Sequence, residues 1–208
     1  VEHMDQKIGN LMAELDRLDI ADDTIVVFTS DNGGERFSNM WPFTGMKTEL
    51  LEGGIRVPLI VRWGDQIPAN SVSDQVMTSM DFAPTLLAAA GQQYNDSIAY
   101  DGLNLLDVLA GRRSIIERKL YWRFKAVEQA ALRAGNWKYL KIAGREYLFN
   151  LILDQHERAN LAFRHPERFA ELKADWENWN SGMLPYTKDT PSHGVIDYLN
   201  LPDRYGPG

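Results

Sequence analysis

The sequence predicts the end of a large α/β domain over residues 1–115, followed by a smaller α+β domain over residues 116–208 with an antiparallel sheet. Two observations support this division. Apolar, β-branched runs without polar alternation lie in the first part and are typical of strands buried on both faces of a parallel sheet. Short strand-like segments separated by glycine-containing turns begin after residue 115, as expected of antiparallel hairpins.

The first part contains two helix candidates and two strand candidates. Apolar residues recur at three- and four-residue spacings over residues 4–18, which predicts a helix with one face directed at a core. Residues 24–29 and 59–63 are the buried-strand candidates. Residues 81–91 predict a short helix, because Asp81 is a suitable N-cap, a proline follows early and a glycine ends the segment.

Four strands and a long helix are expected in the second part. The strand segments are residues 119–125, 128–134, 137–142 and 146–151, with glycine turns between the last three. A helix from residue 166 to about residue 183 carries an apolar stripe, which predicts packing on the sheet. The proline-containing tail that follows has no periodicity and is expected to be irregular.

Composition excludes several classes of function. The formal net charge of −7 over 208 residues argues against a nucleic-acid-binding surface. No apolar run approaches the roughly 20 residues of a membrane span, and the absence of cysteine excludes disulfides, thiolate zinc sites and a cysteine nucleophile. The sequence opens at Val1 in an amphipathic segment without a visible signal peptide, which we interpret as a start inside a longer parent.

The pattern Ser-Asp-Asn-Gly-Gly at residues 30–34 follows directly after the first strand candidate, where open α/β sheets place their ligands. The side chains of Asp31 and Asn32 offer hard oxygens, which suit calcium or magnesium. They offer at most three oxygens, whereas calcium takes about 6–8. Taken alone, the pattern favours an Asx-type turn at a strand end.

An ordered series of motifs resembles the sulfatase family of the alkaline-phosphatase superfamily. The series is Thr24 to Gly33, Gly45-Met46-Lys47, Glu52 to Pro58, Asp81 to Gly91, Asp101-Gly102-Leu103, Tyr121-Trp122-Arg123, Leu132 to Lys138 and Asp154 to Leu161. The resemblance implies the carboxy-terminal part of a sulfatase-like α/β sandwich, followed by a small subdomain with an antiparallel sheet. It also implies that Asp31 and Asn32 are calcium ligands. Lys47 would contact the sulfate ester as a substrate-binding and catalytic residue.

The resemblance further implies a nucleophile that the chain does not contain. Sulfatases of this type use a formylglycine made from the first residue of a Cys/Ser-x-Pro-x-Arg motif, and no such motif occurs in the sequence. Family members take additional acidic calcium ligands, and a histidine or lysine near the nucleophile, from segments that precede the position of Val1. We therefore expect the formylglycine to lie upstream of Val1, the calcium shell to be incomplete, and the chain alone to be inactive.

Several other side chains have a structural and a functional interpretation. From its context alone Lys47 is a solvated loop lysine, and only the resemblance makes it a sulfate ligand. Glu52 and Arg56 are expected to form a pair or to fix the adjacent glycine turn, whereas Trp41 and Phe43 suit a substrate pocket and core packing equally well. The histidines lie in ordinary polar or helical contexts that do not indicate catalysis: His3, His156, His165 and His193.

Two alternative functions stay open at this stage. A phosphodiesterase or phosphonate monoester hydrolase of the same superfamily shares the Asp-Asn-Gly type of strand end, although the Gly-Ile-Arg-Val-Pro context favours a sulfatase. A catalytically dead module that binds a sulfated sugar or a partner chain is the second. The expected ligand is a sulfated small molecule or glycan, namely an aryl or carbohydrate sulfate. An exposed, truncated core would allow dimerisation, and the family is compatible with a periplasmic, secreted or lysosomal-type location.

Overall fold

The chain forms two compact units in a computed structural model that describes residues 1–35, 37–92 and 99–187. The first unit comprises Val1–Phe28 and Leu59–Ile116, and the second comprises Thr29–Pro58 and Glu117–Gly208. The sequence-based division at residue 115 assigned residues 29–58 to the first part, whereas in the structure they group with the second unit. Among the described residues, no helix is both long and apolar enough to cross a membrane.

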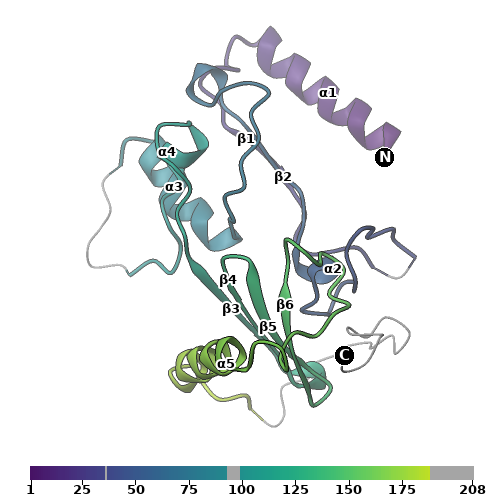
Figure 1. The fold of residues 1–208 in the computed structure, drawn as a ribbon. Helices are drawn as coiled ribbons and strands as arrows, with labels where there is room; N and C mark the ends of the chain where they lie inside the picture. The colour runs from purple at the N-terminus through teal and green to yellow at the C-terminus, as the bar shows by residue number, and fades with distance from the viewer. Residues whose placement is uncertain (36, 93–98, 188–208) are drawn as a thin grey trace. The chain divides into compact units, whose positions relative to one another are not determined.

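The helices and strands expected in the first unit are present (Figure 1). They are α1 (Glu2–Arg17), β1 (Val26–Thr29), β2 (Leu59–Arg62) and α3 (Phe82–Ala89), joined by the short helix α4 (Leu106–Leu109) and the 3₁₀ turns η1 (Gly64–Gln66) and η2 (Ser79–Asp81). Strands β1 and β2 are hydrogen-bonded neighbours in a two-stranded sheet. The apolar, β-branched runs therefore form strands, as their composition predicts.

Two expectations about burial in the first unit are wrong. No residue of α1 is buried, although its apolar stripe was expected to face a core. Strand β1 alternates between half-buried and exposed residues instead of being buried on both faces, and Ile60 on β2 is 61% exposed. An apolar face is buried only where a second apolar surface covers it, and the described part of this chain does not supply enough of that surface.

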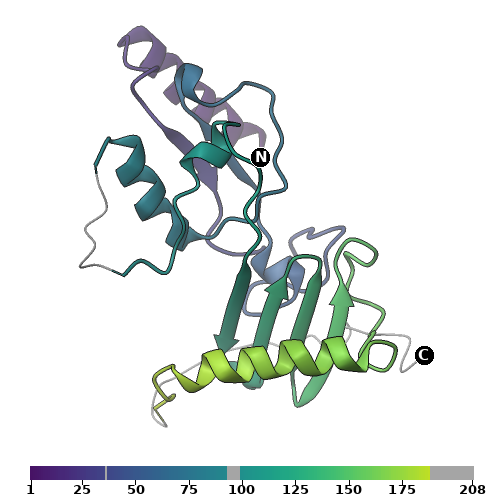
Figure 2. The same cartoon turned by 60° about the vertical axis from the view of Figure 1, so that its left-hand side comes forward.

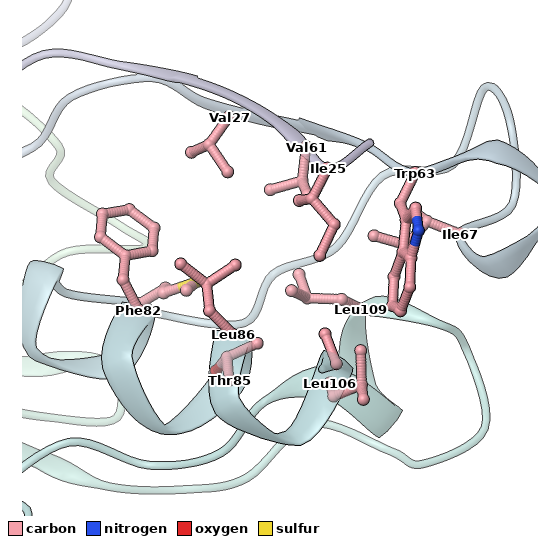
Figure 3. A pocket seen from close by; sticks show the side chains of 12 residues that line it. Ile25, Val27, Val61, Trp63, Ile67, Phe82, Thr85, Leu86, Leu106 and Leu109 are labelled. Carbon is pink, nitrogen blue, oxygen red and sulfur yellow. The ribbon is translucent and has the colours of Figure 1, made fainter. Parts of the chain in front are cut away.

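An apolar hollow lies between the paired strands and the helices α3 and α4 (Figure 3). Val27 and Val61 point into it from the strands and Ile25 from the residue before β1, and Phe82 and Leu86 point into it from α3. Its remaining lining residues are Trp63, Ile67, Met77, Thr85, Ala89, Leu106 and Leu109. The Thr85 hydroxyl accepts a hydrogen bond from the Leu105 N–H at 3.0 Å, and none of the other lining residues carries a charged group. It is therefore not the candidate functional site.

Asp81 has a different role from the one expected. Its carboxylate accepts backbone N–H bonds from Thr78 at 2.7 Å and from Leu103 at 2.8 Å, and it completes a capping box on η2. Helix α3 itself has no side-chain cap at its N-terminus. Gly91 has a φ of 68°, so the C-terminal glycine takes the left-handed conformation that the sequence predicts.

The second unit is built on a four-stranded antiparallel sheet in the order β3-β4-β5-β6, as expected. Its elements are β3 (Lys119–Phe124), the 3₁₀ turn η3 (Ala126–Glu128), β4 (Gln129–Ala134), β5 (Trp137–Ile142), β6 (Arg145–Asn150) and α5 (Pro166–Ser181), together with α2 (Glu52–Ile55). The β5–β6 turn has positive φ at both central residues, 52° at Ala143 and 74° at Gly144, as a two-residue type I′ hairpin requires.

The two faces of this sheet are covered by different parts of the chain. Helix α5 runs across the strands (Figure 2) and packs Leu172 and Trp176 against one face, which confirms the predicted packing of its apolar stripe. On the opposite face, Leu50 and Leu51 join the side chains of Leu140 and its neighbours in a second buried cluster. The segment that precedes α2 is therefore part of the core of this unit. The tail beyond residue 187 lies outside the described residues.

Candidate functional site

The strand-end residues Asp31 and Asn32 lie in a turn directly after β1. The Ser30 hydroxyl donates to the Asn32 backbone carbonyl at 2.8 Å and lies 3.5 Å from Asp31 Oδ1, so a local side-chain turn is present. Asp31 is exposed, whereas the Asn32 Oδ1 atom is shielded from solvent and has no hydrogen-bond partner among the described residues. A buried amide oxygen without a donor costs free energy, and a cation would satisfy it.

Gly33 and the glycine turn of α2 hold this segment by backbone contacts. The Gly33 N–H donates to the Gly54 carbonyl oxygen at 2.8 Å. A Cβ atom on Gly33 would lie 1.7 Å from the Gly53 carbonyl oxygen, so only glycine fits here. The close approach of these two segments therefore requires glycine at position 33.

Lys47 returns to the same segment from the far end of a loop. Its backbone N–H donates to the Gly34 carbonyl oxygen at 2.9 Å. Its ammonium lies 3.8 Å from Glu35 Oε2, and its side chain is 48% exposed, so this is a loose surface ion pair. The structure therefore brings the backbone of Lys47 beside the segment that carries Asp31 and Asn32, with its charge accessible to solvent.

The donor set fits part of a calcium shell. A carboxylate and a shielded amide oxygen are hard ligands of the type that calcium prefers. Over residues 1–35, 37–92 and 99–187, no cluster of three or more His, Cys, Asp or Glu side chains surrounds a potential metal position. Asp31 and Asn32 would thus supply a minority of the oxygens that calcium takes.

A buried group of charges includes Glu52, at the end of the loop that carries Lys47. The sequence motifs did not identify this group. Lys138 Nζ is 2.9 Å from Glu52 Oε1 and 2.8 Å from Glu157 Oε1, and all three side chains are at most 2% exposed. Arg56 Nη1 approaches Glu52 Oε2 at 3.7 Å, in line with the expected pairing of these two residues. One signal was available in the sequence: Lys138 alternates with Leu140 and Ile142, so a lysine shares a strand face with core residues.

Burial and pairing set the charge states of this group. Burial opposes the Lys138 ammonium, but the two carboxylates outweigh it and hold the pKa of Lys138 above its ordinary value. Burial also opposes the Glu52 anion, and the charge of Lys138 outweighs it, so the pKa of Glu52 is lowered. For Glu157 the balance is reversed: burial raises its pKa to about 7 against the attraction of Lys138, and the neighbouring Glu52 charge adds to the rise.

Among the described residues, the aromatic side chains of the loop and the histidines do not form a second centre. Trp41 is 71% exposed, and its ring lies 4.7 Å from that of His156. Phe43 lies under the Arg56 guanidinium at 4.8 Å. His3 lies on α1, His165 precedes α5 with its ring 5.1 Å from Trp137, and His193 is outside the described residues. The proposed pocket role of Trp41 and Phe43 therefore stays a prediction.

Comparisons with known proteins find sulfatases among the similar proteins. The sulfatase family model matches residues 1–92. Human N-acetylgalactosamine-6-sulfatase is 36% identical over 64% of this chain and 26% of its own length. N-acetylgalactosamine-6-O-sulfatase of Bacteroides thetaiotaomicron is 29% identical over 81% of this chain and 39% of its own length.

A solved structure, described as Ps i-CgsB in complex with k-i-k-neocarrahexaose, superposes with a TM-score of 0.76 at 27% identity. The superposition covers 84% of this chain and 40% of the chain in that structure. The chain thus spans between about a quarter and two fifths of the length of these relatives. The family model and both sequence relatives point to the sulfatase family, and the solved structure shares the fold.

Proposed function

We propose that the full-length gene product hydrolyses sulfate monoesters and that this chain supplies part of the site that holds the sulfate group. The observation that carries the proposal is the position of Lys47. Its backbone is hydrogen-bonded to Gly34, two residues after the buried, unpartnered Oδ1 atom of Asn32. The backbone of a residue with a cationic side chain therefore lies beside the segment that carries two residues with hard oxygens, in a chain that matches the sulfatase family model.

The chemistry of sulfate ester hydrolysis explains why these groups are suitable. Negative charge develops on the sulfuryl oxygens and on the leaving oxygen, and fixed positive charge beside them lowers the barrier. Lys47 supplies a compact ammonium for this purpose. Asp31 and Asn32 would hold calcium, which when bound supplies Lewis-acid stabilisation of the same oxygens.

The nucleophile in this proposal lies outside the 208 residues. A formylglycine needs a Cys/Ser-x-Pro-x-Arg motif, which the sequence does not contain. The chain on its own is therefore proposed to be inactive, and to have low affinity for calcium because Asp31 and Asn32 give only part of a shell.

The proposed substrates are carbohydrate sulfates. Two relatives are named as sulfatases of N-acetylgalactosamine, and the solved structure is described with a bound hexaose. The identities of 27–36% leave the specificity loops free to differ, so the individual sugar is not part of the proposal.

The test is a turnover assay on the full-length gene product. The substrates are 4-methylumbelliferyl sulfate, 6-sulfated N-acetylgalactosamine, a matched phosphate monoester and a matched phosphodiester, each assayed with calcium and with a chelator. We expect turnover of the sulfates that is lost on chelation. A preference for the phosphate substrates would overturn the proposal in favour of a phosphodiesterase or phosphonate monoester hydrolase. Binding of the sulfated sugar without turnover of any substrate would show a catalytically dead module.

A further inference from the structure

Residues 44–52, which we call the anchored loop, are tied on both sides of Lys47 to residues of the antiparallel sheet and the turns that follow it. The ties are side-chain-to-backbone hydrogen bonds: Thr44 Oγ1 to the His156 carbonyl, Gln129 Nε2 to the Thr48 carbonyl at 2.9 Å, Leu50 N–H to Gln129 Oε1 at 2.8 Å, and Glu52 N–H to Glu157 Oε2 at 2.6 Å. The partners come from a part of the sequence 79–112 positions away. The sheet unit thus fixes the backbone around Lys47.

One of these ties, from Glu52 to Glu157, belongs to a buried group that these two residues form with Lys138. Lys138 projects from β5 between the two carboxylates, at 2.9 Å from Glu52 and 2.8 Å from Glu157. Its cross-strand neighbour on β4 is Arg133. Two neighbouring cations therefore face the anchored loop from the sheet, and carboxylates from the loop and from the turn after β6 balance them.

Stability alone does not account for this group. Removing charges from water is costly, and well-packed apolar residues at such positions are often as stable as an ion pair or more so. The adjacent positions show that an apolar solution fits here, because Leu51 and Leu140 pack together in the same buried cluster. An ion pair differs from apolar packing in that it defines one geometry for its partners. The ion pair thus fixes the orientation of the Glu52 carboxylate, whereas apolar packing would only bury the residue.

The position of Glu52 is transmitted directly to the site. Glu52 begins α2, and the next two residues are the glycines that contact the strand end. The Gly53 N–H donates to the Thr44 carbonyl at 2.7 Å, and the Gly54 carbonyl accepts from Gly33 at 2.8 Å. A shift of Glu52 would therefore move the base of the Lys47 loop and the segment that follows Asn32 together.

We propose that Lys138 and Glu157 are positioning residues for the sulfate site, because through Glu52 they fix the anchored loop and the contact between Gly54 and Gly33. They act on the site from the sheet unit without touching the substrate. The turnover part of this inference rests on the proposed sulfatase function. The geometric part does not rest on that function, because it concerns only how firmly the anchored loop and the strand end are held in place.

The test compares two variants in the full-length gene product. Glu157→Gln keeps the side-chain volume and a carbonyl oxygen that can accept the Glu52 N–H, and removes only the charge. Lys138→Met removes the ammonium and keeps the aliphatic stem. The matched control is Lys173→Met. Lys173 lies on α5 in the same unit, and its ammonium is 2.8 Å from Glu146 Oε2, so this variant breaks a different ion pair. Each variant is measured by amide hydrogen exchange, calcium titration, thermal midpoint, and kcat and KM for 4-methylumbelliferyl sulfate.

We expect amide exchange over the anchored loop to become about tenfold faster or more in both variants, because the loop loses the charged contact that fixes its direction, although an uncharged residue 157 is itself less costly to bury. We expect kcat to fall by roughly 10- to 100-fold with a smaller change in KM, since misplacement of a charged group by about 1 Å costs rate on this scale. Calcium affinity falls in both variants. The Lys173→Met control lowers the thermal midpoint but leaves the exchange of the loop, kcat and calcium affinity unchanged.

The outcomes separate this inference from the proposed function. If Glu157→Gln folds with unchanged loop exchange and unchanged kcat, the positioning role is refuted even where sulfate turnover is present. If the wild-type protein has no sulfate turnover, the proposed function fails, while faster loop exchange and weaker calcium binding in Glu157→Gln still support the positioning role. Should Lys138→Met not fold, the Glu157→Gln result decides alone.

Discussion

The backbone N–H of Lys47 donates to the carbonyl oxygen of Gly34 over 2.9 Å, and this bond closes the loop that begins at the strand end. Because the bond is made by the backbone, any side chain except proline at position 47 leaves it intact. The backbone conformation of the loop therefore does not depend on the Lys47 ammonium. Substitution of this residue tests the role of its charge separately from the fold.

Lys47→Ala in the full-length gene product is expected to lower kcat for sulfate esters by about 10²- to 10³-fold, the scale on which one fixed charge-stabilising donor is lost. Lys47→Arg should retain part of the activity, because a planar guanidinium replaces a point charge imperfectly. The control is Lys141→Ala, since Lys141 has the same loose 3.8 Å contact with a glutamate but lies on the sheet. Steady-state kinetics with equal loss of turnover in Lys141→Ala would contradict the assignment.

Gly33→Ala is expected to destabilise the second unit by about 1–3 kcal/mol or more, because the new methyl group would overlap backbone atoms. Its Cβ would lie 1.7 Å from the Gly53 carbonyl oxygen, and backbone cannot move aside as a flexible side chain can. The measurement is urea unfolding followed by near-UV circular dichroism.

The matched control for that prediction is Gly182→Ala in the same unit. Gly182 follows α5 with a φ of −84°, and a Cβ there would meet its nearest atom at an ordinary 3.6 Å. Its effect is expected to stay within about 0.5 kcal/mol. Similar unfolding midpoints for the two alanine variants would mean that the contact between Gly33 and α2 is looser than the structure shows.

Much of the secondary structure could be predicted because it is encoded locally. The strands of the sheet and the turns between them follow from alternation and from glycine, and α5 follows from its apolar stripe. Burial could not be predicted in the same way. The stripe of α1 and the apolar run of β1 indicate surfaces that need a partner, and a local pattern does not show whether the described chain supplies one.

In the candidate site, too, local motifs indicated some residues but not their long-range partners. The motifs drew attention to Asp31, Asn32 and Lys47, and the structure brings the backbone of Lys47 to the segment of the other two. The partners of Glu52 could not be found in this way, because they lie 86 and 105 positions away along the chain. Long-range pairs of this kind depend on the register of strands and the path of loops. A lysine on a core face signals that a partner exists without identifying it.

Asp31→Asn is expected to abolish detectable calcium binding by the isolated chain. The unmodified chain should bind calcium weakly, with Kd on the order of 10⁻⁴ M or higher, because few of its oxygens reach one position. The substitution keeps the shape of the side chain but removes the only charge of the pair. The control is Glu128→Gln, which removes the same charge from an exposed position on the sheet unit. Calorimetric titration with tight binding, or with binding unchanged in Asp31→Asn, would contradict the ligand assignment.

The contribution of Glu157 to the stability of the second unit is expected to fall as the pH rises from about 4.5 to about 7. Its pKa is raised from 4.5 to about 7 by burial, with the opposing charge of Lys138 and the like charge of Glu52 beside it. Over this window the folded state binds a proton that the unfolded state has released, so the contribution is fully present below pH 4.5 and is lost through pH 7. At about 1.4 kcal/mol per pKa unit, the rise from 4.5 to about 7 corresponds to a loss on the order of 3–4 kcal/mol.

Glu157→Gln isolates this contribution, because it removes the titrating group with little change in volume. Urea unfolding of the second unit at a series of pH values should show the decline between pH 5 and 8 in the wild type and a flatter profile in the variant. Glu52 does not blur the comparison: its pKa is lowered, so its contribution is lost only as the pH falls below about 4.5. Glu128→Gln, at an exposed position, should keep the wild-type decline. A decline that persists unchanged in Glu157→Gln would assign the pH dependence to another group and would leave Glu157 ionised beside Lys138 throughout the range.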